Sequence, residues 1–136
     1  MPLPILFDTN LVIRHIRQAE QMPAEVVLSM VVVGELEAFA LKADWGYQKV
    51  SFMNKLFQYH PMLEVSRAFT RPYAQLDTYS QGKLSMRPLP SGMSARNMGK
   101  NDLWIAATAL YFDVELHTTD KDFDHLAPLG LKVLRS

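Results

Sequence analysis

Acidic residues are the side chains in this sequence whose types and spacing are best suited to chemistry. Asp102 falls where a predicted helix begins, and Asp120, Asp122 and Asp124 follow a predicted short buried strand, residues 114–118, that ends in polar residues. Taken alone, each acid has a simpler role, because aspartate caps helices well and fills polar turns. Several carboxylates brought together would repel one another unless cations neutralised them, so their placement decides between the two roles.

Two further acids occupy similar places. Asp8 follows the apolar residues 4–7, and Glu35 follows a β-branched run within residues 25–33. Both runs are typical of buried strands. In open α/β sheets, ligands bind where the carboxyl ends of the strands meet. The sequence therefore predicts that four acids from distant positions converge at one sheet edge: Asp8, Glu35, Asp102 and Asp120.

A cluster made only of carboxylates has a restricted chemistry. The chain contains no cysteine, and its four histidines lack the spacing of metal ligands. Oxygen ligands suit hard cations, Mg²⁺ or Mn²⁺, which lower the pKa of water and stabilise in-line displacement at phosphorus. The sequence shows no glycine-rich phosphate loop, Ser-His-Asp order or dinucleotide fingerprint that would indicate other chemistry. The acids thus favour metal-assisted hydrolysis of a phosphate ester or phosphodiester.

The elements that must position these acids alternate along the chain. Strands are predicted at residues 4–7, 25–33, 62–65, 114–118 and 131–134. Helices are predicted after Asp8, from Gly34, over residues 46–58, after Ser66 and over residues 101–112, the last with Asn101 as its N-cap. Residues 82–99 are predicted to form a loop. This order indicates an α/β fold, a three-layer sandwich with a mostly parallel, about five-stranded sheet between helices.

The composition is that of an ordinary globular chain. The 136 residues are 49% hydrophobic and 21% charged, with a net charge of zero. We expect a single domain over residues 1–136 and no membrane span, because no apolar run is long enough. The absence of cysteine and of a signal-like N-terminus leads us to expect a cytoplasmic protein.

Charge is unevenly distributed along the chain. Between Asp77 and Asp102 no residue is acidic, whereas four are basic: Lys83, Arg87, Arg96 and Lys100. A basic segment beside an acidic cluster suits an enzyme that acts on a polyanion, so these residues are candidates for RNA binding. A solvated loop of chance composition is the alternative. Arg14 is likewise either a phosphate contact or a plain surface charge.

Four stretches match one known family in order and spacing. They are residues 6–10, 29–36, 101–107 and 118–123. With these stretches the chain resembles PIN-domain proteins, and most of all the VapC-type ribonuclease toxins of prokaryotic toxin–antitoxin pairs. The chain departs from the family's pattern in the loop before Asp102, which is longer and richer in proline.

The resemblance implies specific roles for the matching residues. The acids at positions 8, 35, 102 and 120 would be the catalytic quartet that holds Mg²⁺ or Mn²⁺ and hydrolyses RNA. Thr118 would lie near the metal, Asn10 would be a supporting polar group, and Asp122 or Asp124 would be an accessory acid.

The resemblance also implies two protein partners, a second copy of the chain and a small antitoxin. Aromatic residues are frequent in residues 35–57, and we expect them to leave an exposed apolar interface; they are Phe39, Trp45, Tyr47, Phe52 and Phe57. Two other functions stay open: an RNA-processing nuclease without an antitoxin, and a PIN-like binding module without catalysis.

Overall fold

A parallel sheet forms the centre of the fold. A computed structural model describes residues 3–136, and its strands are β1 (Ile5–Phe7), β2 (Val26–Ser29), β3 (Met62–Leu63), β4 (Glu115–Thr118) and β5 (Val133–Arg135). In this part of the chain they form one five-stranded sheet in the order β3-β2-β1-β4-β5, and each neighbouring pair is parallel. The predicted parallel α/β fold is confirmed.

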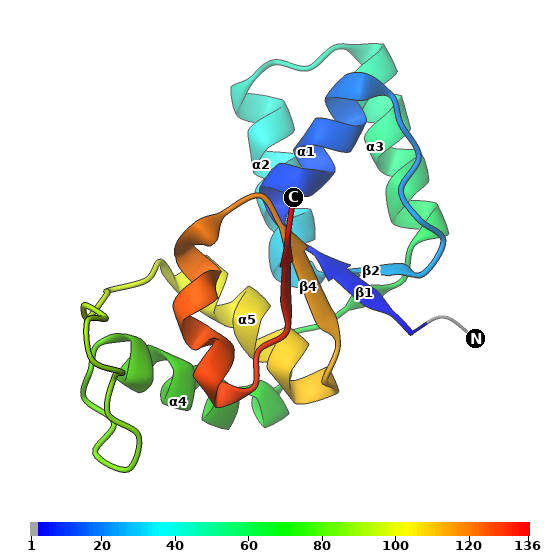
Figure 1. The fold of residues 1–136 in the computed structure, drawn as a ribbon. Coiled ribbons are helices and arrows are strands. Elements are labelled where there is room, and N and C mark those ends of the chain that lie inside the picture. Colours follow the sequence, from blue (N-terminus) through cyan, green and yellow to red (C-terminus); the bar gives the residue numbers. More distant parts are fainter. Residues whose placement is uncertain (1–2) are drawn as a thin grey trace.

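Helices cover both faces of this sheet. They are α1 (Thr9–Gln18), α2 (Met30–Lys42), α3 (Tyr47–Tyr59), α4 (Thr70–Ser80) and α5 (Lys100–Phe112), with 3₁₀ helices η1 (Arg67–Phe69) and η2 (Lys121–Leu129). In Figure 1, α1, α2 and α3 gather on one side of the strands, and α4 and α5 lie on the other. None of the helices found in residues 3–136 combines the length and apolar character that crossing a membrane requires.

The central strands are buried because helices pack on both of their faces. Leu6 of β1 and Leu116 of β4 are fully inaccessible to solvent and lie directly opposite each other in the sheet. Burying a leucine side chain contributes about 1.5–3 kcal/mol. On α5, the buried residues Ala106, Ala107 and Ala109 have small side chains, which let the helix lie close to its neighbours. This packing holds the start of α5 near the carboxyl edge of β1 and β4.

Helix α2 begins earlier than the sequence suggests. The β-branched run predicts a strand through residue 33 and a helix from Gly34, but the helix already starts at Met30. The reason is local: the Ser29 side chain accepts a hydrogen bond from the Val31 amide at 3.1 Å and so caps the helix. Glu35 therefore lies in the second turn of α2 rather than at its entrance.

A second prediction needs correction. Helix α5 starts at Lys100 with Gly99 in the N-cap position, so Asn101 is not the N-cap. The residues after β4, where a polar turn was the simpler role for the acids, form the helix η2 with Asp120 as its N-cap. The Asp120 side chain accepts a hydrogen bond from the Asp122 amide at 2.9 Å, which starts the 3₁₀ helix.

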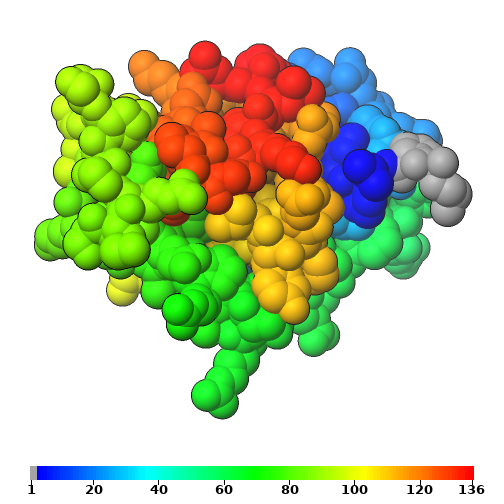
Figure 2. Space-filling model, turned by 60° about the horizontal axis from the view of Figure 1, so that its bottom comes forward, coloured from blue at the N-terminus to red at the C-terminus, as the bar shows by residue number. Residues whose placement is uncertain are grey.

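Residues 82–99 form the predicted loop, and the loop is attached to its surroundings. The Arg87 guanidinium donates a hydrogen bond to the Pro128 carbonyl at 2.8 Å, and Arg96 pairs with Asp122 at 3.3 Å. In addition, the Ser80 hydroxyl donates to the Arg96 carbonyl at 2.8 Å. Figure 2 shows the loop, in yellow-green, lying against η2, in orange-red. The loop is thus fixed to η2 and α4.

Candidate functional site

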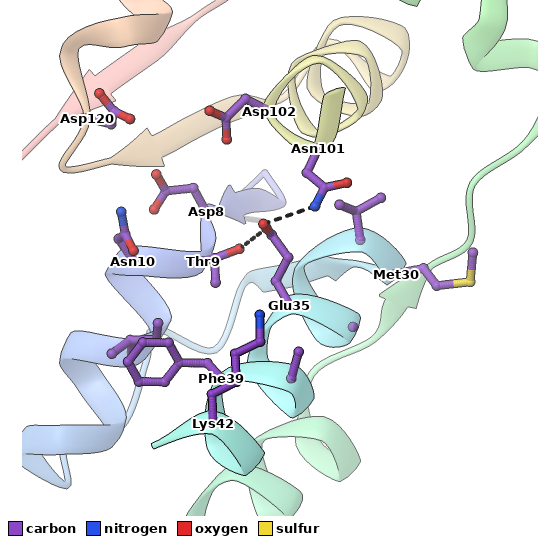
Figure 3. A pocket seen from close by; sticks show the side chains of 14 residues that line it. Asp8, Thr9, Asn10, Met30, Glu35, Phe39, Lys42, Asn101, Asp102 and Asp120 are labelled. Carbon is purple, nitrogen blue, oxygen red and sulfur yellow. Dashed lines mark hydrogen bonds between the residues drawn. The ribbon is translucent and has the colours of Figure 1, made fainter. Parts of the chain in front are cut away.

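A cavity of about 600 Å³ opens at the carboxyl edge of the sheet, beside β1 and β4. The chain leaves β1 through α1 toward β2 and leaves β4 through η2 toward β5, so the connections that follow these two paired strands diverge to opposite sides. Such a divergence is where open α/β sheets form ligand sites. All four predicted acids line the cavity wall, as Figure 3 shows: Asp8, Glu35, Asp102 and Asp120.

Asp8 is held in place by the two elements it joins. Its side chain caps α1, accepting a hydrogen bond from the Leu11 amide at 3.1 Å, and its other carboxylate oxygen accepts one from the Thr118 hydroxyl. Burial raises the pKa of Asp8, and these two hydrogen bonds oppose that rise. The nearby carboxylates of Asp120 and Glu35 raise the pKa further.

Asp102 experiences the repulsion of the whole cluster. It lies in the first turn of α5 and is partly buried. Burial raises the pKa of Asp102 to about 6, with further contributions from Asp120 and Glu35 and then from Asp8. Asp102 thus lies close enough to the other three carboxylates to be affected by their charge, and the cavity that all four line is a negative environment.

Glu35 is oriented by two neutral side chains. The Thr9 hydroxyl donates a hydrogen bond to Oε1 at 2.6 Å, and the Asn101 amide donates to Oε2 at 3.2 Å. These bonds tie α2 to the starts of α1 and α5, as the dashed lines in Figure 3 show. Sequence reasoning assigned neither role. The only signal was that Thr9 and Asn101 directly adjoin Asp8 and Asp102 in the matched stretches.

Thr118 connects two of the acids. Its hydroxyl donates to Asp8 and accepts a hydrogen bond from the Asp120 backbone amide at 2.9 Å. The side chain is fully buried at the end of β4. One hydroxyl therefore fixes the acids that follow β1 and β4 relative to each other.

The donor set fits a hard divalent cation in its chemistry, because it offers carboxylate oxygens and a negative charge that a cation would neutralise. Within residues 3–136, however, no three acidic or histidine side chains are already grouped closely enough to hold a metal ion. In this arrangement Thr9 and Asn101 each donate a hydrogen bond to one oxygen of Glu35.

The supporting residues predicted from the sequence are divided between two places. Asn10 lines the cavity. Asp122 and Asp124 are not among the residues that line it; the first pairs with Arg96 at 3.3 Å, and the second pairs with Arg135 at 3.0 Å. Their side chains therefore hold the loop and β5.

The basic candidates are also dispersed. Arg14 is exposed and lines a second cavity, next to the acidic one. Lys83 and Lys100 are exposed, and the loop arginines make the contacts with η2 described above. A lysine that sequence reasoning missed, Lys42, lines the acidic cavity and extends its ammonium group toward Glu35 (Figure 3). It offsets part of the negative charge.

The aromatic side chains of α2 and α3 are less exposed than the sequence suggests. Of the five predicted residues only Tyr47 is largely exposed, at 86%, and the other four are half-buried against the core. Leu41 adds a second large apolar side chain at 83% exposure. The exposed apolar surface in this region is thus smaller than predicted.

Comparison with solved structures identifies the same fold in complete chains of similar length. VapBC2 from Rickettsia felis, solved bound to a DNA fragment from its promoter, has a TM-score of 0.74 and 20% identity, and the match covers 98% of this chain and 99% of that one. VapBC-5 from Mycobacterium tuberculosis has a TM-score of 0.70 and 25% identity, covering 99% and 100%. VapC20 from Mycobacterium tuberculosis, described as a sarcin-ricin loop cleaving toxin, has a TM-score of 0.61 and 15% identity, covering 97% and 99%.

A comparison with curated proteins found no match. The sequence profile of the family described as "PIN domain" matches residues 5–129, which include every strand but β5 and all four acids of the cavity. With the parallel sheet, the acidic cavity and the shared fold, this match is conclusive: the chain belongs to the PIN domain family.

Proposed function

We propose that this chain is an endoribonuclease that depends on Mg²⁺ or Mn²⁺ and acts as the toxin of a toxin–antitoxin pair. One observation carries the proposal: four carboxylates from the ends of β1 and β4, from α2 and from the start of α5 line one cavity. Membership of the PIN domain family and the likeness to VapC20, described as a sarcin-ricin loop cleaving toxin, support a nuclease.

The cation would be held by the carboxylates of Asp8, Glu35, Asp102 and Asp120. When bound, such an ion lowers the pKa of water and neutralises negative charge on a phosphodiester. The other residues serve to position these ligands. Thr118 holds Asp8 and the Asp120 backbone, and the hydrogen bonds from α1 and α5 orient Glu35.

A single-stranded RNA labelled at its 5′ end tests the chemistry. We expect the purified chain to cut it in Mg²⁺ or Mn²⁺ and not in EDTA, leaving 5′-phosphate ends, because attack by an activated water does not use the 2′-hydroxyl. Asp8→Asn should lose cleavage, whereas Glu37→Gln, an exposed acid of the same helix as Glu35, should retain it. Cleavage that persists in EDTA, or 2′,3′-cyclic phosphate products, would contradict the proposal.

The proposed protein partners are a small antitoxin and a second copy of the chain. The support is indirect: the structures that share this fold include VapBC complexes and a toxin–antitoxin complex from Klebsiella pneumoniae. We expect the product of a neighbouring gene to co-purify with the chain and to inhibit cleavage. A chain that cuts RNA as a monomer and forms no such complex would instead be an RNA-processing nuclease.

A further inference from the structure

A second cavity of about 440 Å³ adjoins the acidic one. Three residues line both cavities, namely Asn10, Ile13 and Phe39. The second cavity is otherwise lined by four polar or basic residues: Arg14, Arg17, Gln18 and Thr119. Thr119 lines the second cavity and Asp120, the next residue, lines the acidic one, so both cavities also reach the residues that follow β4. A linear polymer bound in one cavity can therefore continue into the other.

The second cavity has the opposite electrostatic character. Its lining residues include two arginines and no acidic residue. Arg14 and Arg17 are exposed and stand three residues apart on α1, so they face the same side of the helix. Within residues 3–136 neither forms an ion pair. The Arg17 guanidinium lies 5.3 Å from the centre of the Phe39 ring, a cation–π contact that fixes it at the border of the two cavities.

These features match the needs of a phosphodiester chain. Four carboxylates repel a polyanion, so a strand that delivers one phosphate to the acidic cavity needs positive charge where its next phosphate lies. Arginine binds phosphate oxygens through a planar pair of N–H groups, and the neighbouring amides and hydroxyl supply further donors. The combination of arginines, neutral donors and no acid fits phosphate rather than a metal or an apolar ligand.

The loop of residues 82–99 is less suited to this role. Both of its arginines already make contacts with η2, through the Pro128 carbonyl and the Asp122 carboxylate. Figure 1 shows the loop beside α4 and η2, away from α1. Lys42 of α2 lies inside the acidic cavity, and the pair of arginines that adjoins this cavity is on α1.

We propose that Arg14 and Arg17 form a phosphate subsite that holds the phosphodiester next to the one in the acidic cavity, so that single-stranded RNA runs from the acids over α1. This inference rests on the proposed ribonuclease function and adds the path that the RNA follows across the protein surface. An acidic peptide segment could also meet two arginines, but it would gain nothing from lying next to four carboxylates.

Binding of a labelled single-stranded RNA in EDTA, measured at several salt concentrations, tests the subsite without cleavage. Arg14→Gln/Arg17→Gln should weaken binding and reduce the slope of log affinity against log salt by about 1.4, since each phosphate contact on a single strand contributes about 0.7. Arg14→Lys/Arg17→Lys should keep most of the slope. Lys49→Gln/Lys55→Gln removes the same charge from exposed positions of α3 outside both cavities and should leave the slope unchanged.

Cleavage in Mn²⁺ separates this inference from the function it rests on. The arginine double variant should show a raised KM and an unchanged kcat, with the same metal-induced rise in Tm as the wild type. The subsite would be refuted if the glutamine pair bound RNA like the wild type, or if Lys83→Gln/Lys100→Gln lowered the slope instead. The subsite would likewise be refuted if the two arginines were needed for binding oligoglutamate but not for binding RNA. A wild type that binds RNA through these arginines but never cuts it would overturn the proposed function alone.

Discussion

Replacing Asp102 by Asn should stabilise the metal-free protein at neutral and alkaline pH. The substitution keeps the shape of the side chain and removes one of four mutually repelling charges. Because the pKa of Asp102 is raised, the folded state binds its proton more tightly than the unfolded chain does. The contribution of Asp102 to the free energy of unfolding of the wild type therefore falls as the pH rises from about 4 to about 6. It stays low at higher pH.

The raised pKa sets the size of the effect. A rise from 3.8 to about 6 corresponds to about 3 kcal/mol, at about 1.4 kcal/mol for each pH unit. The side chain is only partly buried, so solvent reduces both the cost of burying its charge and the repulsion by the other carboxylates, and we expect about 1–2 kcal/mol in practice. For a chain of this length the gain corresponds to a Tm increase of about 3–8 °C.

Urea unfolding of the wild type and of Asp102→Asn, in EDTA at pH 8 and again at pH 4, measures this difference. We expect the variant to be more stable at pH 8 and the difference to be much smaller at pH 4, where the Asp102 carboxyl group is protonated in the folded state and partly protonated in the unfolded chain. Added Mg²⁺ should reverse the order at pH 8, because a cation stabilises only the intact cluster. An Asn variant that is equally or less stable than the wild type in EDTA at pH 8 would refute the reasoning.

Two further substitutions examine individual hydrogen bonds and burial. Thr118→Val should destabilise the protein by about 1.5–3 kcal/mol at pH 8 in urea unfolding, because the buried Asp8 carboxylate loses its hydroxyl donor. If the loss of stability were the same at pH 3, packing and not the charge on Asp8 would account for it. The pKa of His125 is lowered from 6.5 by burial and by the charge of Arg96, so wild-type stability should fall relative to His125→Gln as the pH drops below 6.5. Thermal melts between pH 7.5 and 5 measure that difference, and a constant gap between the two proteins would contradict it.

The meeting of the acids at one edge could be foreseen because it depends only on topology. Asp8 and Asp120 follow two parallel strands, and the ends of parallel strands meet at one edge wherever the strands pair. Asp102 was placed by its position in the first turn of a helix rich in alanine. These inferences need only the sequence pattern and the order of the elements.

Features that depend on competing or long-range contacts could not be foreseen. The β-branched Val31, Val32 and Val33 favour a strand, yet the cap from Ser29 and the packing of α2 place them in a helix. Asn101 has the chemistry of an N-cap, but a residue 66 positions away, Glu35, takes up its amide. For Asn101 no local signal distinguishes the two outcomes, because its partner is supplied only by the folded chain. For α2 the local cap was available in the sequence, but the β-branched residues favour the other outcome.

The hydroxyl of Thr118 has a consequence for the timing of synthesis. It joins residues 110 positions apart, and β1 pairs with β4 only after that whole length of chain exists. Contacts of such long range form late in folding, since closing a large loop costs entropy before any pairing rewards it. A growing polypeptide that ends just before β4 already carries Asp8, Glu35 and Asp102, but it lacks both Asp120 and the strand that places Asp120 beside Asp8. The four acids therefore cannot assemble while most of the chain is still being translated, and the nuclease activity proposed above would begin only after β4 and η2 have been made.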